Sequence, residues 1–353
     1  MTERDTKAEA ATANRPPGAP RQLWIDLLRG FLMLAIVFDH TEICFTGDNI
    51  VPYRLYVPDV LMAFFFLSGY LFYKPGGFRF GHKMRSWLRC ILLPYFIFTT
   101  ALALPKAWLH GNDASTVELL QTILTGQGSW FIAALAVGEL LLSLLLWLTR
   151  ERTGWLLVAL VLSGVVSLAF GTGIWSFEPN WWHANEAAAS LFYLLLGYAV
   201  HRCDHLGDRP RLVLFILLLL AAIPANVLAG QSTWPSVRVG ALVLPNGYIV
   251  KNTLSVLFLY LLCTLRSPQG QRWVELLPHS LLRPVAWTGR RSLVYYFFSS
   301  GIPTALTALF ARLGYVFQGR YVEVVVVFFL NYALISAVTW FVYRYLPWAT
   351  GRR

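Results

Sequence analysis

Long apolar segments recur along almost the whole chain, and they constrain its fold more than any other feature. A soluble domain cannot bury so many of them, because 57% of the residues are hydrophobic and only 13% are charged. The sequence therefore predicts an all-α, polytopic transmembrane bundle of about ten helices. The expected spans are approximately residues 23–43, 58–73, 86–104, 129–149, 154–172, 186–201, 211–229, 248–265, 292–310 and 321–343.

The domain organisation follows from what these segments leave over. Residues 1–22 are polar, with several Ala, Thr and Pro, and are expected to form a disordered cytoplasmic tail. They do not resemble a secretory signal, because the apolar run that follows is too long and carries Arg29. The connections between runs are short, which predicts one membrane domain at 23–346 and a short cytoplasmic tail at 347–353.

The distribution of positive charge predicts the orientation. If the N-terminus is cytoplasmic, 21 of the 29 lysines and arginines fall in inner segments, 5 in outer segments and 3 within spans. This bias predicts that both termini are cytoplasmic. The net charge of +11 then reflects topology and attraction to anionic lipid, and no basic-aromatic module indicates a nucleic-acid partner. The four cysteines are isolated, so neither a metal site nor a disulfide is expected.

Ionisable residues inside the first apolar run are the main functional signal. Ten residues separate Arg29 from His40, so on a helix the two lie about 20° apart in direction and about 16 Å apart along the axis. Asp26, Met33 and Ile36 fall on the same stripe. Because charges in lipid are costly, the stripe predicts a polar seam facing a buried, partly hydrated cavity.

His40 has two interpretations of similar weight on the sequence alone. A neutral imidazole can accept a proton from a hydroxyl, which suits a general base in acyl transfer. It can equally be an interfacial histidine that hydrogen-bonds to a neighbouring helix. Asp39 and Glu42 project in other directions on the same helix, so a partner of His40 is expected from another element.

Basic residues gather where the third apolar run begins. Arg85 and Arg89 are four residues apart, hence on one helix face, and with Lys83 they could hold the phosphates of a nucleotide-bearing donor such as coenzyme A. The commoner explanation of such a cluster is an ordinary positive-inside flank with snorkelling side chains. Arg290 and Arg291, at another inner boundary, could join a phosphate site.

Other polar positions in the runs are candidates for the same cavity. Glu139 needs a partner in the membrane, and Arg29 or Lys251 could supply one. Asn252 beside Lys251 could line the cavity or form an interhelical hydrogen bond. Trp130 fits an aromatic belt as readily as a sugar-stacking platform.

Several of these segments together, in this order along the chain, resemble the membrane acyltransferase-3 family of bacterial O-acyltransferases. The likeness extends over almost the whole chain after residue 22. Its motifs are Ile25-Asp26-Leu27-Leu28-Arg29-Gly30 followed by His40, Phe64-Phe65-Phe66-Leu67-Ser68-Gly69-Tyr70, the basic segment that ends at Pro94-Tyr95, Trp130-Phe131, and Gly289-Arg290-Arg291-Ser292-Leu293.

The resemblance implies roles for particular residues. His40 matches the family's catalytic histidine, Arg29 an essential arginine, and Arg85 and Arg89 the arginine pair that serves the acyl-CoA donor. Three residues lie between Arg85 and Arg89 here, whereas two are commoner in the family. The implied reaction, in a bacterial inner membrane, transfers an acyl group, commonly acetyl from acetyl-CoA, to a sugar hydroxyl of a surface polysaccharide or its lipid-linked precursor.

Two other functions stay open on the sequence. Buried Arg29, Glu139 and Lys251 could form the substrate or proton path of a secondary transporter or flippase for a glycan precursor. The sequence shows neither the repeated halves nor the matched Gly/Pro-broken helices that many transporters have, and this counts against that function. A non-catalytic subunit of the same fold is the third alternative. A direct transfer and an acyl-histidine relay also stay open, as do the acyl group, the acceptor sugar and a homo-oligomeric state.

Overall fold

The computed structural model describes residues 22–109, 115–203, 207–230, 236–266 and 272–351. Most of the predicted tail at 1–22, and residues 352–353 of the predicted C-terminal tail, lie outside the described residues. The elements in chain order are α2 (Leu23–Thr46), α3 (Tyr53–Phe72), α4 (Phe80–Trp87), the π-helix η1 (Leu88–Leu92), α5 (Leu93–Leu109), α6 (Thr116–Leu124), α7 (Trp130–Thr149), α8 (Thr153–Gly171), η2 (Trp181–His183), α9 (Ala184–Arg202), α10 (Asp208–Gly230), β1 (Ser236–Val239), β2 (Leu242–Pro245), α11 (Tyr248–Thr264), η3 (Trp273–Leu276), α12 (His279–Arg290), α13 (Ser292–Arg312), α14 (Tyr321–Tyr345) and η4 (Pro347–Thr350).

The predicted helical membrane fold is confirmed in its class. Seven helical segments are long and apolar enough to cross a membrane: α3, α4–α5, α7, α8, α10, α13 and α14. The other three expected spans are helices too, namely α2, α9 and α11, but α2 carries several charges and α11 has only 17 residues. The sequence did not predict the antiparallel β1–β2 hairpin or the short helices α4, α6 and α12. The cytoplasmic placement of both termini stays a prediction.

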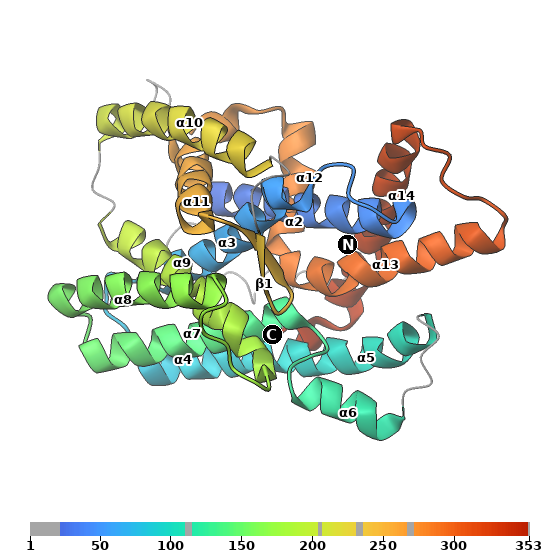
Figure 1. The fold of residues 1–353 in the computed structure, drawn as a ribbon, viewed down its shortest axis with the longest axis horizontal. Coiled ribbons are helices and arrows are strands. Elements are labelled where there is room, and N and C mark those ends of the chain that lie inside the picture. Colours follow the sequence, from blue (N-terminus) through green and yellow to red (C-terminus); the bar gives the residue numbers. More distant parts are fainter. Residues whose placement is uncertain (1–21, 110–114, 204–206, 231–235, 267–271, 352–353) are drawn as a thin grey trace, which may run out of the picture.

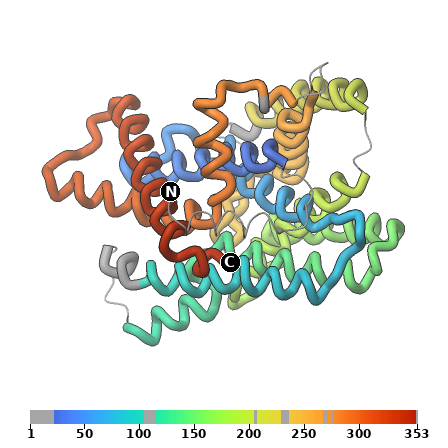
Figure 2. Tube along the Cα trace, turned by 180° about the vertical axis from the view of Figure 1, so that it is seen from behind, coloured from blue at the N-terminus to red at the C-terminus, as the bar shows by residue number. Residues whose placement is uncertain are grey.

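Helices α2 and α3 lie in the middle of the bundle. Figure 1 shows α2 and α3 between a layer that contains α4, α5, α7 and α8 and the opposite edge formed by α10; Figure 2 shows the same order from behind. Burial agrees, since 78% of the apolar window of α3 is inside the protein against 11% of that of α10. Functional groups on α2 and α3 are therefore enclosed by protein rather than by lipid.

Glycines let the central helices approach closely. A Cβ added at Gly69 of α3 would overlap the carbonyl group of Leu194 in α9, and one added at Gly197 of α9 would overlap that of Phe66 in α3. This reciprocal contact gives Gly69 a packing role, because only a residue without a side chain allows two helix backbones so near each other.

A second reciprocal glycine contact sets α2 against α12. Gly30 of α2 packs on the carbonyl group of Val285, and Gly289 of α12 packs on that of Asp26. Asp26 itself is buried at this crossing. The contact fixes the position of the residue after the crossing, Arg290, relative to Arg29 on α2.

Candidate active site

A polar cavity lies inside the bundle against one face of α2. It has a volume of about 290 Å³, and Arg29, Met33 and Ile36 of α2 line it. These are three of the five residues of the predicted stripe, whereas Asp26 and His40 do not line the cavity. The other walls come from α3, η1, α7, α12, α13, α14 and η4. We call this space the central cavity.

The polar groups of the central cavity gather toward the end where α2 and α13 begin, which we call the inner end. Two arginines, Arg29 and Arg290, line it there together with Ser68 and Glu139. Tyr296 of α13 lies further along, where Phe131 donates its backbone N–H to the phenolic oxygen at 3.2 Å. A cavity with two guanidinium groups at one end suits an anionic or strongly polar ligand group.

His40 lies one helical turn beyond Ile36 toward the opposite, outer end, and is half-buried. Its Nδ1 is 3.1 Å from Oγ of Ser299 in α13, and Ser299 donates a hydrogen bond of 2.9 Å to the carbonyl oxygen of Tyr296. The prediction that the partner of His40 comes from another helix is confirmed. His40 is not among the residues that line the central cavity, whose described walls include Ile36 and Tyr296 at this end.

Glu139 has a different partner from the two expected. Its Oε2 is 2.7 Å from Nζ of Lys83, and Ser68 donates a short hydrogen bond to its Oε1. Lys83 was expected to hold a donor's phosphates, yet its ammonium lies here over the ring of Phe72, 3.6 Å from the centroid. Sequence spacing could not show this pair, because the two residues are brought together by the packing of α4 on α7.

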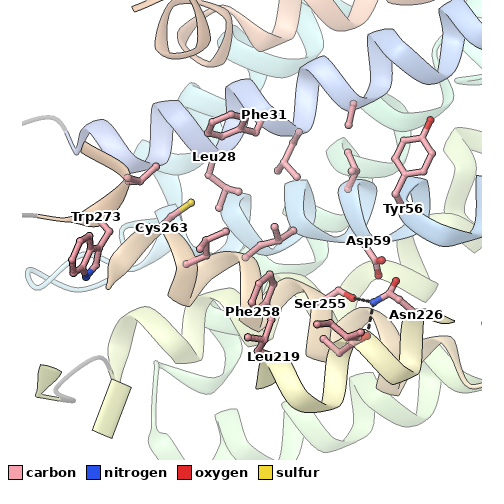
Figure 3. Close-up of a pocket in the computed structure, with 18 of the residues that line it drawn as sticks. Leu28, Phe31, Tyr56, Asp59, Leu219, Asn226, Ser255, Phe258, Cys263 and Trp273 are labelled. Carbon is pink, nitrogen blue, oxygen red and sulfur yellow. Dashed lines mark hydrogen bonds between the residues drawn. The ribbon is translucent and has the colours of Figure 1, made fainter. Parts of the chain in front are cut away.

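Lys251 lies away from the central cavity and does not pair with Glu139. Its Nζ is 2.6 Å from Oδ2 of Asp59 in α3, and both side chains are buried. Asp59 borders a separate, largely apolar groove of about 810 Å³ between α2, α3, α10 and α11 (Figure 3). Asn226 of α10 donates to Ser255 at 2.9 Å beside it.

Asn252, the neighbour of Lys251, is fully buried on α11. Among the described residues its side-chain amide has no hydrogen-bond partner, and it does not line the central cavity. The interhelical hydrogen bond that was one of the two expectations for Asn252 is therefore not formed with any described residue. Of the candidates in the later spans, the structure brings Arg290 into the central cavity but not Lys251 or Asn252.

Arg85 and Arg89 are exposed at the inner end, on opposite sides of the junction between α4 and the π-helix η1. A π-turn holds one residue more than an α-turn and is frequent at functional sites. The carbonyl of Arg89 packs against Gly351, which brings the end of the chain to this place.

The other predicted cavity residues lie around its rim. Arg291 stacks over the rings of Trp287 and Tyr343, with its guanidinium carbon 4.4 and 5.1 Å from the centroids. Trp130 begins α7, as expected, and packs on Phe131, a residue of the cavity wall. Arg291 thus supports the wall formed by Tyr343, while Trp130 supports the outer wall.

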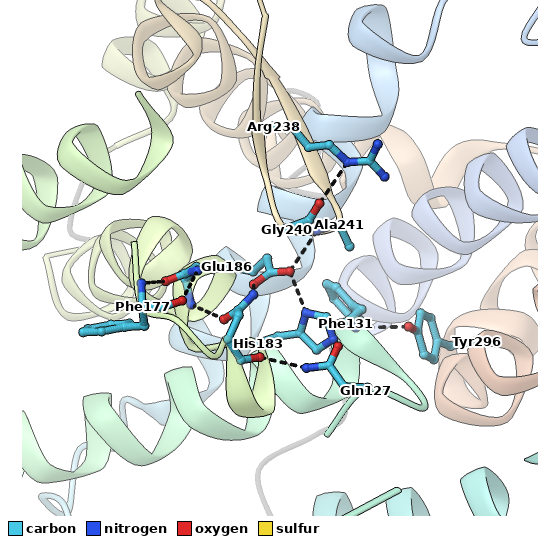
Figure 4. A network of polar contacts seen from close by, with 11 residues as sticks. Gln127, Phe131, Phe177, His183, Glu186, Arg238, Gly240, Ala241 and Tyr296 are labelled. Atoms are coloured by element: carbon cyan, nitrogen blue, oxygen red, sulfur yellow. Dashed lines mark hydrogen bonds and ion pairs between the residues drawn. The ribbon is translucent and has the colours of Figure 1, made fainter. Parts of the chain in front are cut away.

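A network at the outer end, which the sequence did not indicate, holds the loops over α7 (Figure 4). Glu186 is fully buried, lies 2.6 Å from Nδ1 of His183, and accepts hydrogen bonds from Ala241 at 2.9 Å and Asn180 at 2.8 Å. His183 packs on Trp130, with ring centroids 6.3 Å apart. The network therefore ties the β1–β2 hairpin to the outer wall of the central cavity.

The fold and the cavity define a polytopic membrane protein whose helices surround a cavity with several charged and polar side chains in its walls. A family model described as an acyltransferase domain, that of acyltransferase 3, matches residues 22–344, most of the chain. The chain therefore belongs to the acyltransferase-3 family and is a membrane acyltransferase. This membership favours an enzyme over a transporter. No curated protein and no solved structure gives a significant match.

Proposed function

We propose that this enzyme transfers an acyl group, acetyl in the simplest case, from cytoplasmic acyl-CoA to a sugar hydroxyl of a surface polysaccharide or its lipid-linked precursor. The contact of His40 with Ser299 is the observation that carries the proposal. It gives the chain a histidine held by a partner from another helix, at the outer end of a stripe whose Arg29, Met33 and Ile36 line the central cavity.

The contacts of Ser299 are compatible with the form of the imidazole that the proposal needs. The Ser299 hydroxyl has a single hydrogen, which can be donated to the carbonyl oxygen of Tyr296. With the hydrogen in that position the hydroxyl oxygen accepts from His40, and a neutral His40 then has its proton on Nδ1 and its lone pair on Nε2. This is the tautomer that a general base needs if the acceptor approaches Nε2.

In the proposed reaction, Nε2 of His40 takes the proton of the acceptor hydroxyl as its oxygen attacks the thioester carbonyl carbon. The carbon–sulfur bond then breaks, and the leaving thiolate receives the proton from the imidazolium. The products are the O-acylated sugar and free coenzyme A. Proton transfer by a positioned histidine contributes about 10²- to 10⁴-fold to such rates.

Arg29 acts on a different part of the substrates in this proposal. Three helical turns, about 16 Å, separate it from His40 along α2, so the two side chains do not meet at one reacting atom. Arg29 and Arg290 line the inner part of the central cavity, where they can steady the polar arm of the donor. The exposed Arg85 and Arg89 bind one of its phosphates at the inner surface in this proposal.

The test of the base uses three variants and one radiolabelled donor. His40→Ala should reduce transfer from labelled acetyl-CoA to the glycan by at least about 100-fold. Ser299→Ala, which removes the orienting hydroxyl, should reduce it by about 10-fold, the effect of one lost hydrogen bond. His279→Ala, at an exposed histidine, is the matched control and should transfer normally. Normal transfer by folded His40→Ala protein would remove His40 from the mechanism.

The acyl group and acceptor are tested on the product. The polysaccharide of a deletion strain, compared with that of its parent by proton NMR, should lack an acetyl resonance. Loss of a succinyl or other acyl resonance would name a different donor, and identical spectra would exclude a polysaccharide acceptor in that organism. Labelled acetyl-CoA that acylates nothing would favour the non-catalytic subunit.

A further inference from the structure

A second cavity opens at the inner end, at the turn between α3 and α4. It has a volume of about 470 Å³, and the basic side chains of Lys74, Arg79, His82 and Lys83 line it. No carboxylate is among its described lining residues. We call it the basic cleft. Three permanent cations around one hollow favour a ligand with several negative charges, such as an organic polyphosphate.

The basic cleft adjoins the central cavity along two helical segments. On α3, Ser68 lines the central cavity and Phe72 lines the basic cleft, four residues or about 6 Å further along. On the α4–η1 segment, Ser86 lines the cleft and Cys90 lines the cavity, again four residues apart. The two spaces are therefore consecutive along the same pair of helices.

One ion pair stands at the boundary between them. Lys83 belongs to the wall of the basic cleft, whereas its partner Glu139, 2.7 Å away, belongs to the wall of the central cavity. Ser68 donates a hydrogen bond to Glu139 from the cavity side, and the Lys83 ammonium lies over Phe72 on the cleft side. Lys83 is the accessible member, since its side chain keeps 24% of its exposure, whereas that of Glu139 keeps 8% and is buried.

We propose that the basic cleft binds a phosphate-bearing ligand, and that its phosphate takes Lys83 from Glu139 and so opens a passage from the cleft to the central cavity. The inference rests on the proposed function only for the identification of that ligand as the acyl donor. With the ion pair formed, the cavity is closed toward the cleft; with the ligand bound, the pair is exchanged for a lysine–phosphate contact.

The exchange is physically balanced. A phosphate group offers more negative charge and more acceptor oxygens than one carboxylate, so Lys83 gains by changing partner. Glu139 keeps the hydrogen bond from Ser68 and faces a cavity that Arg29 and Arg290 also line. The carboxylate is therefore not left as an isolated buried charge, which would cost several kcal/mol. Phosphate binding and opening are thus coupled through one lysine.

The coupling is measured by the binding of inorganic pyrophosphate to the purified full chain. Glu139→Gln should tighten pyrophosphate binding by at least about threefold, because the competitor for Lys83 has lost its charge. Lys83→Gln should weaken binding by a similar factor. In the double variant, Glu139→Gln should have no further effect, since there is no lysine to compete for. Glu323→Gln, at a partly buried carboxylate that pairs with the exposed Arg320 away from the cleft, is the control and should bind as the parent does.

Two results would overturn the proposal. One is unchanged or weaker pyrophosphate binding by folded Glu139→Gln protein; the other is an equal effect of that substitution with and without Lys83. If Glu139→Gln does not fold, Glu139→Asp retracts the carboxylate by one methylene and should shift the affinity in the same direction.

Opening itself has a separate readout. Leu135 lines the central cavity, and a Leu135→Cys variant on a Cys90→Ala background reports access to that space. Pyrophosphate should increase the rate at which a water-soluble maleimide labels position 135, located by peptide mass spectrometry, and Lys83→Gln should label rapidly without it. An unchanged rate in both cases would refute the passage. Neither readout involves acyl transfer, so this proposal and the proposed function can fail independently.

Discussion

The buried pair of Lys251 and Asp59 offers a sharp test of whether a charged residue in this bundle is structural or catalytic. Nζ of Lys251 lies 2.6 Å from Oδ2 of Asp59, and the side chains keep only 2% and 9% of their exposure, respectively. The lysine also donates to the backbone carbonyl oxygen of Leu55 at 3.2 Å. Lys251 was a candidate for the catalytic cavity, but the structure pairs it with Asp59, which borders the apolar groove between α2, α3, α10 and α11.

Removing either partner should be costly, because the other charge is then buried alone. We expect Lys251→Met and Asp59→Leu each to lower the free energy of unfolding by about 3–5 kcal/mol. At about 2 °C per kcal/mol for a chain of this size, the midpoint of thermal unfolding should fall by about 6–10 °C. The double variant replaces both charges by apolar side chains, and its midpoint should return to within about 2 °C of the parent or exceed it.

The assay is thermal unfolding in one detergent, followed by acyl transfer with the double variant. If the pair is structural, the loss of stability in the double variant should be far smaller than the sum of the losses in the two single variants, and the double variant should still transfer the acyl group. If the double variant is as unstable as the two losses combined, the coupling that we derive from the contact is wrong. A stable double variant without transfer would instead return Lys251 to the reaction.

Two further predictions concern packing and the outer network. Gly69→Ala should strongly reduce the yield of folded protein, because the new methyl group would overlap the Leu194 backbone. Gly301→Ala, with open space around the added methyl group, is the control and should fold normally. Fluorescence-detected size-exclusion chromatography compares the two yields. Glu186→Gln should speed proteolytic cleavage near Ala241, since the amide cannot serve as the shared acceptor of its present donors; equal cleavage rates would show that the network does not hold the hairpin.

The sequence was a good guide where local regularity controls the structure. Helical periodicity placed Arg29, Met33 and Ile36 on one face, and that face does line a cavity. The cost of exposing an arginine to lipid predicted that the face would turn inward. The same argument required a partner for Glu139 but could not name it, because it constrains the environment of a charge and not the identity of its neighbours.

The hydropathy of the sequence and the helical period of its polar residues thus determined by themselves that this chain forms a helical membrane bundle, and which side of its first helix is polar. Only the tertiary structure decided which groups meet: His40 with Ser299, Glu139 with Lys83, and Asp59 with Lys251. The reason is that each of these contacts joins helices distant in the chain, and their relative rotation and height are set by packing such as the glycine crossings. No residue spacing within one helix records that rotation or height.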